Sequence, residues 1–192
     1  VVSGVSILET LRDSYGYDVK IISYLQGNKY LYSRGYNNLN EVTPVDYCSI
    51  GLLPTNKMGV YIHNCIREFT PDLIVVDGEP LMIKSIKISH PSIKVVALLN
   101  PADVVNSNNY KEAMDFFNEF YSLSDLAIVH GLRRIDKDSR YNEFLSISTI
   151  IRPEIIGIKN VPTNNIYCVL GGGTVNVAVS YTHLTLPTSD LV

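Results

Sequence analysis

The sequence lacks several patterns that would assign it to common classes of protein. No run of about 18 apolar residues occurs in its 192 residues, so no transmembrane helix is encoded. Lysine and arginine form no dense run and the formal net charge is −3, which disfavours nucleic-acid binding through a basic surface. The three cysteines, Cys48, Cys65 and Cys168, show neither metal-ligand spacing nor a disulfide framework. They are typical of free thiols in a reducing cytoplasm.

The sequence contains enough apolar residues to form a hydrophobic core. Hydrophobic residues make up 46% of the chain and the mean hydropathy is +0.11, unlike a disordered or collagen-like sequence. The length fits one domain, or one domain and the start of another.

The stretch from Val179 to Thr188, VSYTHLTLPT, resembles one translated reading frame of the transposon-end adapter used to prepare DNA for sequencing. A polar strand that ends at a proline is the alternative. Because scars of this kind have no part in the fold, we expect residues 179–192 to be non-native and the native sequence to break off near Ala178. The start also reads as cut, because Val1 is not a methionine and no strand precedes the first helical pattern.

Short apolar runs alternate with helical patterns along most of the chain. We expect strands at Val19–Ser23, Asp72–Asp77, Lys94–Leu99, Asp125–Val129 and Ile147–Ile151. Apolar residues at helical spacing predict helices at Asn56–Phe69 and Pro80–Ser89. Two more are expected, one that carries Val5, Ile7, Leu8 and Leu11 and is capped by Gly16, and one that carries Ala113, Phe116, Phe117 and Phe120. The segment Gln26–Tyr36 shows only a polar, aromatic pattern interrupted by glycines. The alternation predicts an α/β fold, a Rossmann-like doubly wound parallel sheet with helices on both faces.

The character of the chain changes near its end. We expect residues 1–156 to form one Rossmann-like domain whose first strand is truncated, followed by a linker over residues 157–165 that is rich in Pro, Thr and Asn. Ile166–Leu170 then reads as a new strand. Residues 166–178 would be the first strand and Gly-rich turn of a second, truncated domain.

Loops that follow parallel strands gather at one edge of a sheet, and ligands bind there. Asp77 and Glu79 follow the clearest strand, and two carboxylates at this edge can accept hydrogen bonds from sugar hydroxyls, or one can act as a general base. The alternative is helix capping, in which Asp77 caps the next helix, Glu79 favours its dipole and Pro80 occupies its first turn.

Two further polar residues follow strands. Asn100 follows the second clear strand, and His130 follows the third with Gly131 beside it, so both are candidates for ligand contact. His63 is expected to be a packed or surface residue of a helix, and His90, which precedes a strand, to lie away from the site. No Ser/His/Asp set and no His/Cys metal cluster is recognisable from spacing.

The remaining candidates lie near the predicted linker. A Gly-rich turn, Gly171-Gly172-Gly173-Thr174, directly follows a predicted strand and would let backbone N–H groups approach a phosphate. A tight turn without function is equally compatible with this spacing. Arg152 follows the last predicted strand of the first domain and can pair with an anionic ligand in an interdomain cleft or form a salt bridge that holds the linker.

Three motifs together resemble the GT-B glycosyltransferases, closest to family 28: PDLIVVDGEP from Pro71, IIRPEI from Ile150 and YCVLGGGT from Tyr167. The resemblance implies two Rossmann domains, with an acceptor in the N-terminal one and a UDP-sugar in the C-terminal one. Asp77 and Glu79 match the family's acidic turn, Gly171, Gly172 and Gly173 the donor-side glycine turn, and Arg152 the Arg-Pro before the linker. The family's N-terminal strand and Gly-His loop do not occur before Val5: either Ser3-Gly4 is a remnant of the loop, or the loop lies upstream of the expected cut.

The resemblance also implies the activity. We expect an inverting transfer of N-acetylglucosamine or another hexose to an unknown glycan, lipid or small-molecule acceptor, with the UDP-sugar as co-substrate and neither cofactor nor metal. The protein would be cytoplasmic, with peripheral association at the inner membrane face in the full-length enzyme, and this chain alone would be inactive. An NDP-sugar 2-epimerase fragment and a non-catalytic Rossmann-like binding module are the alternatives.

Overall fold

A computed structural model describes residues 2–24, 26–37, 39, 56–105, 111–136, 138 and 140–159. The chain divides into two units, Val1–Ile158 and Lys159–Val192, and every helix and strand named below belongs to the first. The predicted second-domain strand with its Gly-rich turn, residues 166–178, and the tail 179–192 lie outside the described residues.

The centre of the first unit is a sheet of four strands, all parallel, in the order β1-β2-β3-β4. The strands are β1 (Leu73–Asp77), β2 (Lys94–Leu99), β3 (Leu126–His130) and β4 (Phe144–Ile147). The predicted α/β, Rossmann-like class is confirmed. The described strands follow one another in sequence order, so the reversal of strand order that marks a switch point does not fall among them.

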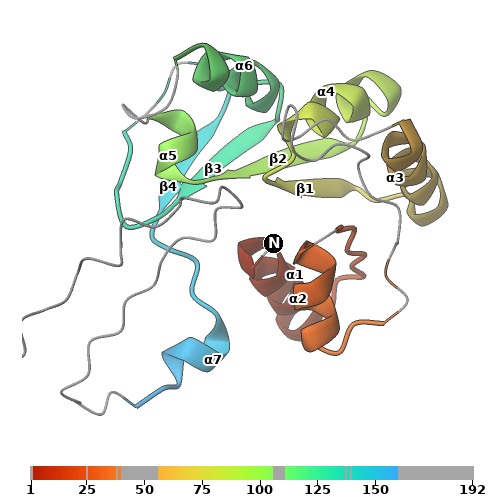
Figure 1. The fold of residues 1–192 in the computed structure, drawn as a ribbon, viewed down its shortest axis with the longest axis vertical. Helices are drawn as coiled ribbons and strands as arrows, with labels where there is room; N and C mark the ends of the chain where they lie inside the picture. Colours follow the sequence, from red (N-terminus) through yellow and green to blue (C-terminus); the bar gives the residue numbers. More distant parts are fainter. Residues whose placement is uncertain are drawn as a thin grey trace, which may run out of the picture. The chain divides into compact units, whose positions relative to one another are not determined.

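Helices lie on both faces of this sheet (Figure 1). On one face, α4 (Pro80–Ser89) connects β1 to β2, and α5 (Pro101–Val104) with α6 (Lys111–Tyr121) connects β2 to β3. Both crossovers share a face because consecutive right-handed connections in sequence order must do so. On the other face α1 (Val2–Tyr15) contacts β1, and α2 (Gln26–Ser33) follows it.

Two further helices complete the described part. The first is α3 (Asn56–Phe69), which precedes β1; Thr70 follows it with φ +47°, and Pro71 then prevents its continuation, as the sequence predicts. The second is the short α7 (Pro153–Ile156), which follows β4.

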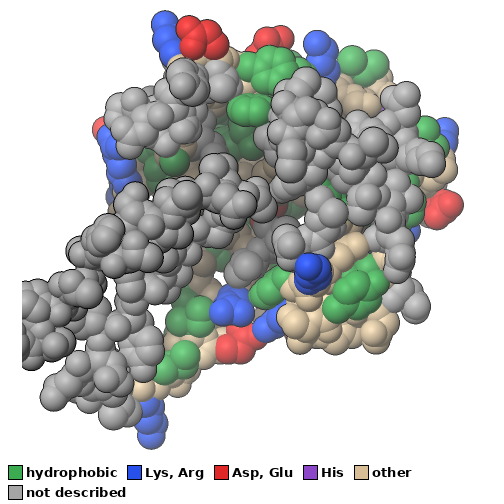
Figure 2. All heavy atoms as spheres, in the orientation of Figure 1, with side chains coloured by type: hydrophobic (Ala, Val, Ile, Leu, Met, Phe, Trp, Pro, Cys, Tyr) green, Lys and Arg blue, Asp and Glu red, His purple; other side chains and the backbone are tan. Residues whose placement is uncertain are grey.

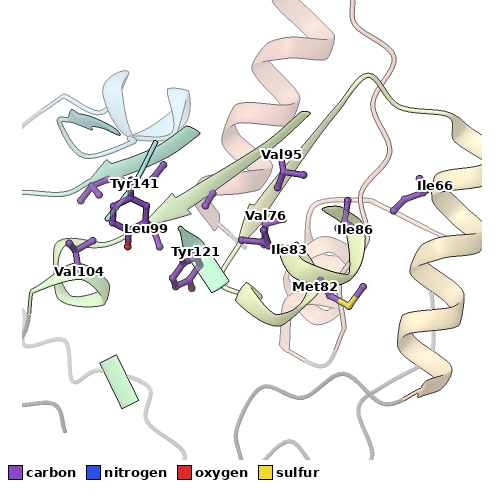
Figure 3. Packing of buried hydrophobic residues seen from close by; sticks show 13 residues of the cluster. Ile66, Val76, Met82, Ile83, Ile86, Val95, Leu99, Val104, Tyr121 and Tyr141 are labelled. Carbon is purple, nitrogen blue, oxygen red and sulfur yellow. The ribbon is translucent and has the colours of Figure 1, made fainter. Parts of the chain in front are cut away.

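The core lies between the sheet and the helices α3, α4 and α6. Its centre consists of buried residues from neighbouring strands, Val95, Ala97, Leu99, Ala127 and Val129, together with Ile83 and Ile86 of α4. Figure 3 labels Val95, Leu99, Ile83 and Ile86 among them. The near-continuous apolar sequence of β2 follows from this position, because a central strand is covered on both faces.

The N-terminal region differs from the prediction in two places. Val19–Ser23 forms no strand, since a strand needs a neighbouring backbone to pair with and none of the described strands pairs with this run. The glycine-interrupted segment instead contains α2. Gly35 ends that helix with φ +84°, and Tyr36 N–H donates to the Leu31 carbonyl (3.1 Å) in a Schellman-type closure.

The fourth strand also lies elsewhere than predicted. It covers Phe144–Ile147 and shares only Ile147 with the expected Ile147–Ile151. The aromatic ring of Phe144 packs against the core beside Tyr141, with ring centroids 5.7 Å apart, while Ile151 is 49% exposed. Packing of the larger aromatic side chain against the core therefore favours a strand at Phe144–Ile147 over one at Ile147–Ile151. Arg152 consequently follows the strand by five residues rather than directly.

Candidate functional site

The predicted residues Asp77, Asn100 and His130 lie at one edge of the sheet, where β1, β2 and β3 end. Asp77 is the last residue of β1 and pairs in register with Leu98, Asn100 directly follows β2, and His130 is the last residue of β3. Neighbouring strands are about 4.8 Å apart, so these residues come from three adjacent positions along the edge. Sequence reasoning placed this edge correctly because parallel strands all end on the same side.

Asp77 is held by the first turn of α1. The backbone N–H of Gly4 donates to Asp77 Oδ2 over 3.1 Å. A Cβ on Gly4 would lie 3.0 Å from the same oxygen, so the absence of a side chain lets the helix and the carboxylate approach. The predicted capping of α4 by Asp77 is therefore wrong, because the residue at that N-cap is Glu79. The Asp77 carboxylate instead accepts a hydrogen bond from the first turn of α1, a helix distant in sequence.

Glu79 is an acid at this edge whose pKa is shifted strongly upward. It occupies the N-cap position of α4 but makes no side-chain capping bond, because its side chain turns to accept a hydrogen bond from the hydroxyl of Tyr24. Its other oxygen, Oε1, is buried and has no partner among the described residues. Burial raises the pKa of Glu79 to about 7, although the Tyr24 hydrogen bond works in the opposite direction.

Backbone geometry explains how the turn presents these two carboxylates. Gly78 lies between them with φ +80°, a conformation that suits glycine, and Pro80 begins α4 as predicted. A side chain at position 78 would meet no neighbour, so the glycine serves the backbone angle alone.

His130 is buried, with 6% of its surface exposed, and its Nδ1 has no partner among the described residues. The next residue, Gly131, lies against the ring of Pro101, because a Cβ there would be only 2.7 Å from Pro101 Cδ. The loops after β2 and β3 are thus in close contact. Asn100, between β2 and α5, is exposed.

Among the described residues, Arg152 contacts α2 and not the strand ends. It is half-buried at the N-cap of α7, and its Nη1 donates to Tyr30 Oη over 3.5 Å. The ion pair that anchors this segment belongs to Glu154 instead, which pairs with Arg34, and Arg34 also binds Glu9 of α1 over 2.5 Å. The salt bridge considered for Arg152 is thus made two residues further on.

Sequence reasoning missed Tyr24 and Gly4, which bind the two carboxylates. Tyr24 directly follows the run that resembles a strand, and its pairing with a residue 55 positions away leaves no local pattern. The sequence suggests for Ser3-Gly4 only the remnant of a loop, whereas in the structure Gly4 is the residue that approaches Asp77.

Other features of the described residues do not enlarge this site. A depression of about 330 Å³ is lined by Asp115, Asn118, Glu119, Ser122 and Arg140, none of which was predicted as a site residue. The described part contains no group of three or more His, Cys, Asp or Glu side chains arranged to hold a metal. None of its helices has the length and apolar character needed to cross a bilayer. The predicted donor residues Gly171, Gly172, Gly173 and Thr174 lie outside the described residues.

Comparison of the chain with protein-family models, with curated proteins and with solved structures finds no match.

Proposed function

We propose that this chain carries the acceptor domain of a glycosyltransferase similar to GT-B family 28, which transfers N-acetylglucosamine or another hexose from a UDP-sugar to an acceptor hydroxyl. One observation carries the proposal: Glu79, at the ligand edge of a parallel sheet, has a pKa of about 7 and a buried oxygen without a partner in the described part of the chain. A carboxylate in that state is suited to general-base chemistry near neutral pH.

In this proposal Glu79 removes the proton from the acceptor hydroxyl. The hydroxyl oxygen then forms a bond to the anomeric carbon, and the bond from that carbon to the UDP oxygen breaks with inversion. Tyr24 orients the carboxylate by donating to its other oxygen. The buried Nδ1 of His130, which has no hydrogen-bond partner in the described part of the chain, and the exposed Asn100 at the neighbouring strand end supply polar groups for the acceptor.

The donor side of the proposal rests on the resemblance. The backbone amides of the Gly171–Gly173 turn would bind the diphosphate and stabilise the departing UDP, and Arg152 would face the cleft. We propose a cytoplasmic enzyme that approaches lipid or glycan acceptors at the inner membrane face. On the face seen in Figure 2, Lys and Arg side chains lie scattered among Asp and Glu, which supports a partner other than nucleic acid.

The first test is the DNA that flanks the sequence coding for this chain. The proposal predicts a Gly-His loop encoded upstream of Val1 and a UDP-binding half downstream of about residue 178. A stop codon soon after Gly173 would contradict it. An intact downstream half that instead matches an NDP-sugar 2-epimerase would favour that alternative.

The second test uses the completed enzyme and measures UDP release from UDP-N-acetylglucosamine, UDP-glucose and UDP-galactose. Glu79→Gln should lower kcat by about 10²–10⁴-fold and remove the limb of the pH profile near 7. Asp72→Asn is the matched control, since Asp72 is exposed just before the opposite end of β1. The 192-residue chain alone should release no UDP. Equal activity of Glu79→Gln and Asp72→Asn would exclude Glu79 as the base.

If the completed protein binds a nucleotide or sugar but turns over none of these donors, the chain is a binding module. Calorimetry with the same three UDP-sugars separates this outcome from loss of folding.

A further inference from the structure

A second group of reactive side chains lies between α3 and α4. Both ring nitrogens of His63 in α3 form hydrogen bonds: Nε2 lies 2.7 Å from Ser85 Oγ, and Nδ1 lies 3.1 Å from His90 Nε2. The two imidazole rings are stacked, with centroids 5.2 Å apart and planes inclined by 29°. The three residues thus form one continuous hydrogen-bonded chain from a hydroxyl through two imidazoles.

This group is separate from the strand-end site. Ser85 lies inside α4 and His90 is its C-cap residue, immediately before the turn that leads into β2. It therefore lies toward the end of the sheet where the strands begin, opposite to Glu79. All three side chains are half-buried, so they are shielded in part but still reachable from solvent.

The arrangement has the parts of an activated nucleophile. A hydroxyl is weakly nucleophilic unless an adjacent base accepts its proton, and the base works best when a third group holds its tautomer. With the proton of His63 on Nδ1, donated to His90 Nε2, the lone pair on Nε2 accepts the Ser85 hydroxyl proton. The distances from hydroxyl to base and from base to orienting group fall within the range expected for such sets.

The charge state of His63 agrees with a role as base. Its partial burial, followed by the proximity of His90 and of Arg67, lowers the pKa of His63 below its ordinary value. At pH 7 the ring is therefore neutral and able to accept a proton.

We propose that Ser85 is an activated nucleophile and a site of covalent acylation by small activated esters. Ser85 Oγ bonds to the ester carbonyl carbon, its proton passes to His63 Nε2, and the leaving alkoxide or phenolate departs with the electron pair of the broken C–O bond. His90 positions His63 through Nδ1. Because Ser85 lies inside a helix, its backbone N–H is paired there and offers no oxyanion hole. The acyl group should consequently accumulate rather than turn over.

The test treats the full 192-residue chain with p-nitrophenyl acetate, follows p-nitrophenolate release and locates the acetyl group by peptide mass spectrometry. Ser85 should acquire the acetyl group about 100-fold faster than Ser89, an exposed serine one helical turn further along α4. This comparison needs no variant, so it does not depend on any substitution being tolerated. Equal acetylation of the two serines would overturn the proposal.

Variants then identify the roles. Ser85→Ala should abolish the labelled site, His63→Gln should lower its rate by about 100-fold, and His90→Gln by about tenfold. The wild-type rate should be level near pH 7 and decline at acidic pH, below the ordinary histidine value of 6.5, as His63 becomes protonated. Circular dichroism checks the fold of each variant, with Asp72→Asn as a control. A folded His63→Gln chain that labels at the wild-type rate, or a rate that rises at acidic pH, would contradict the proposal.

Discussion

At the scale of single residues, the ionisation of Glu79 makes the free energy of unfolding depend on pH. Its pKa is raised from 4.5 to about 7, so the protonated form is favoured in the folded state. The stability gained from protonated Glu79 is fully present below pH 4.5 and is lost as the pH rises through 7. Glu79→Gln keeps a neutral acceptor for Tyr24, and above pH 7 it should raise the free energy of unfolding by about 1–2 kcal/mol over wild type. Urea denaturation at pH 5 and pH 8 measures this; an equal difference at both pH values would be inconsistent with it.

A second residue-scale prediction concerns two glycines. Gly131→Ala places a Cβ 2.7 Å from the rigid ring of Pro101 and should cost about 1–3 kcal/mol of unfolding free energy. Gly59→Ala, inside α3, meets no neighbouring atom and should stabilise the chain by about 0.5–1 kcal/mol. Thermal denaturation of both variants compares the two effects. Similar shifts of Tm in the same direction would show that the loops after β2 and β3 are not in close contact.

At the scale of elements, Asp125 joins three of them at the edge where the strands begin. Its carboxylate accepts hydrogen bonds from Lys87 Nζ of α4 (2.9 Å) and from the backbone N–H of Val95 in β2 (2.8 Å), and it directly precedes β3. Burial acts against ionisation, but these hydrogen bonds outweigh it and hold the pKa of Asp125 at about 2.

Because this pKa is lowered, the contribution of Asp125 to stability is present above pH 3.8 and is lost as the pH falls through 2. Asp125→Asn should therefore destabilise the chain by about 1–2 kcal/mol at pH 7, and by less as the pH approaches 2. Guanidinium denaturation over this pH range tests it, with Asp72→Asn as the exposed control. A cost that does not change with pH would point to packing instead of charge.

At the scale of the whole described unit, the order of the strands predicts which backbone amides are best protected from hydrogen exchange. The strands β2 and β3 have neighbours on both sides, whereas β1 and β4 each pair on one side among the described strands. Native-state hydrogen exchange should be slowest at the amides of Val95, Ala97, Leu99, Ala127 and Val129, because their exposure requires the core to open. Exchange in α7, whose residues are all exposed, should be much faster. Faster exchange in β2 than in β4 would contradict this order.

Much of the fold was accessible from local pattern. The boundaries of α3, α4 and β2 match the prediction because each element carries its own periodicity and its own boundary signal: Pro71 after α3, Pro80 at the start of α4 and Asn100 after β2. The strand at Val19–Ser23 and the position of β4 were wrong, since an apolar run becomes a strand only when tertiary pairing or an aromatic anchor such as Phe144 selects it.

The sequence by itself determined the α/β class and the edge at which Asp77, Asn100 and His130 lie, because both follow from alternation and from strands that all point one way. Only the tertiary structure decided the partners. It placed Gly4 on Asp77, Tyr24 on Glu79, and His63 between Ser85 and His90. These contacts join residues between 22 and 73 positions apart, and no periodicity of a single helix or strand encodes such a separation.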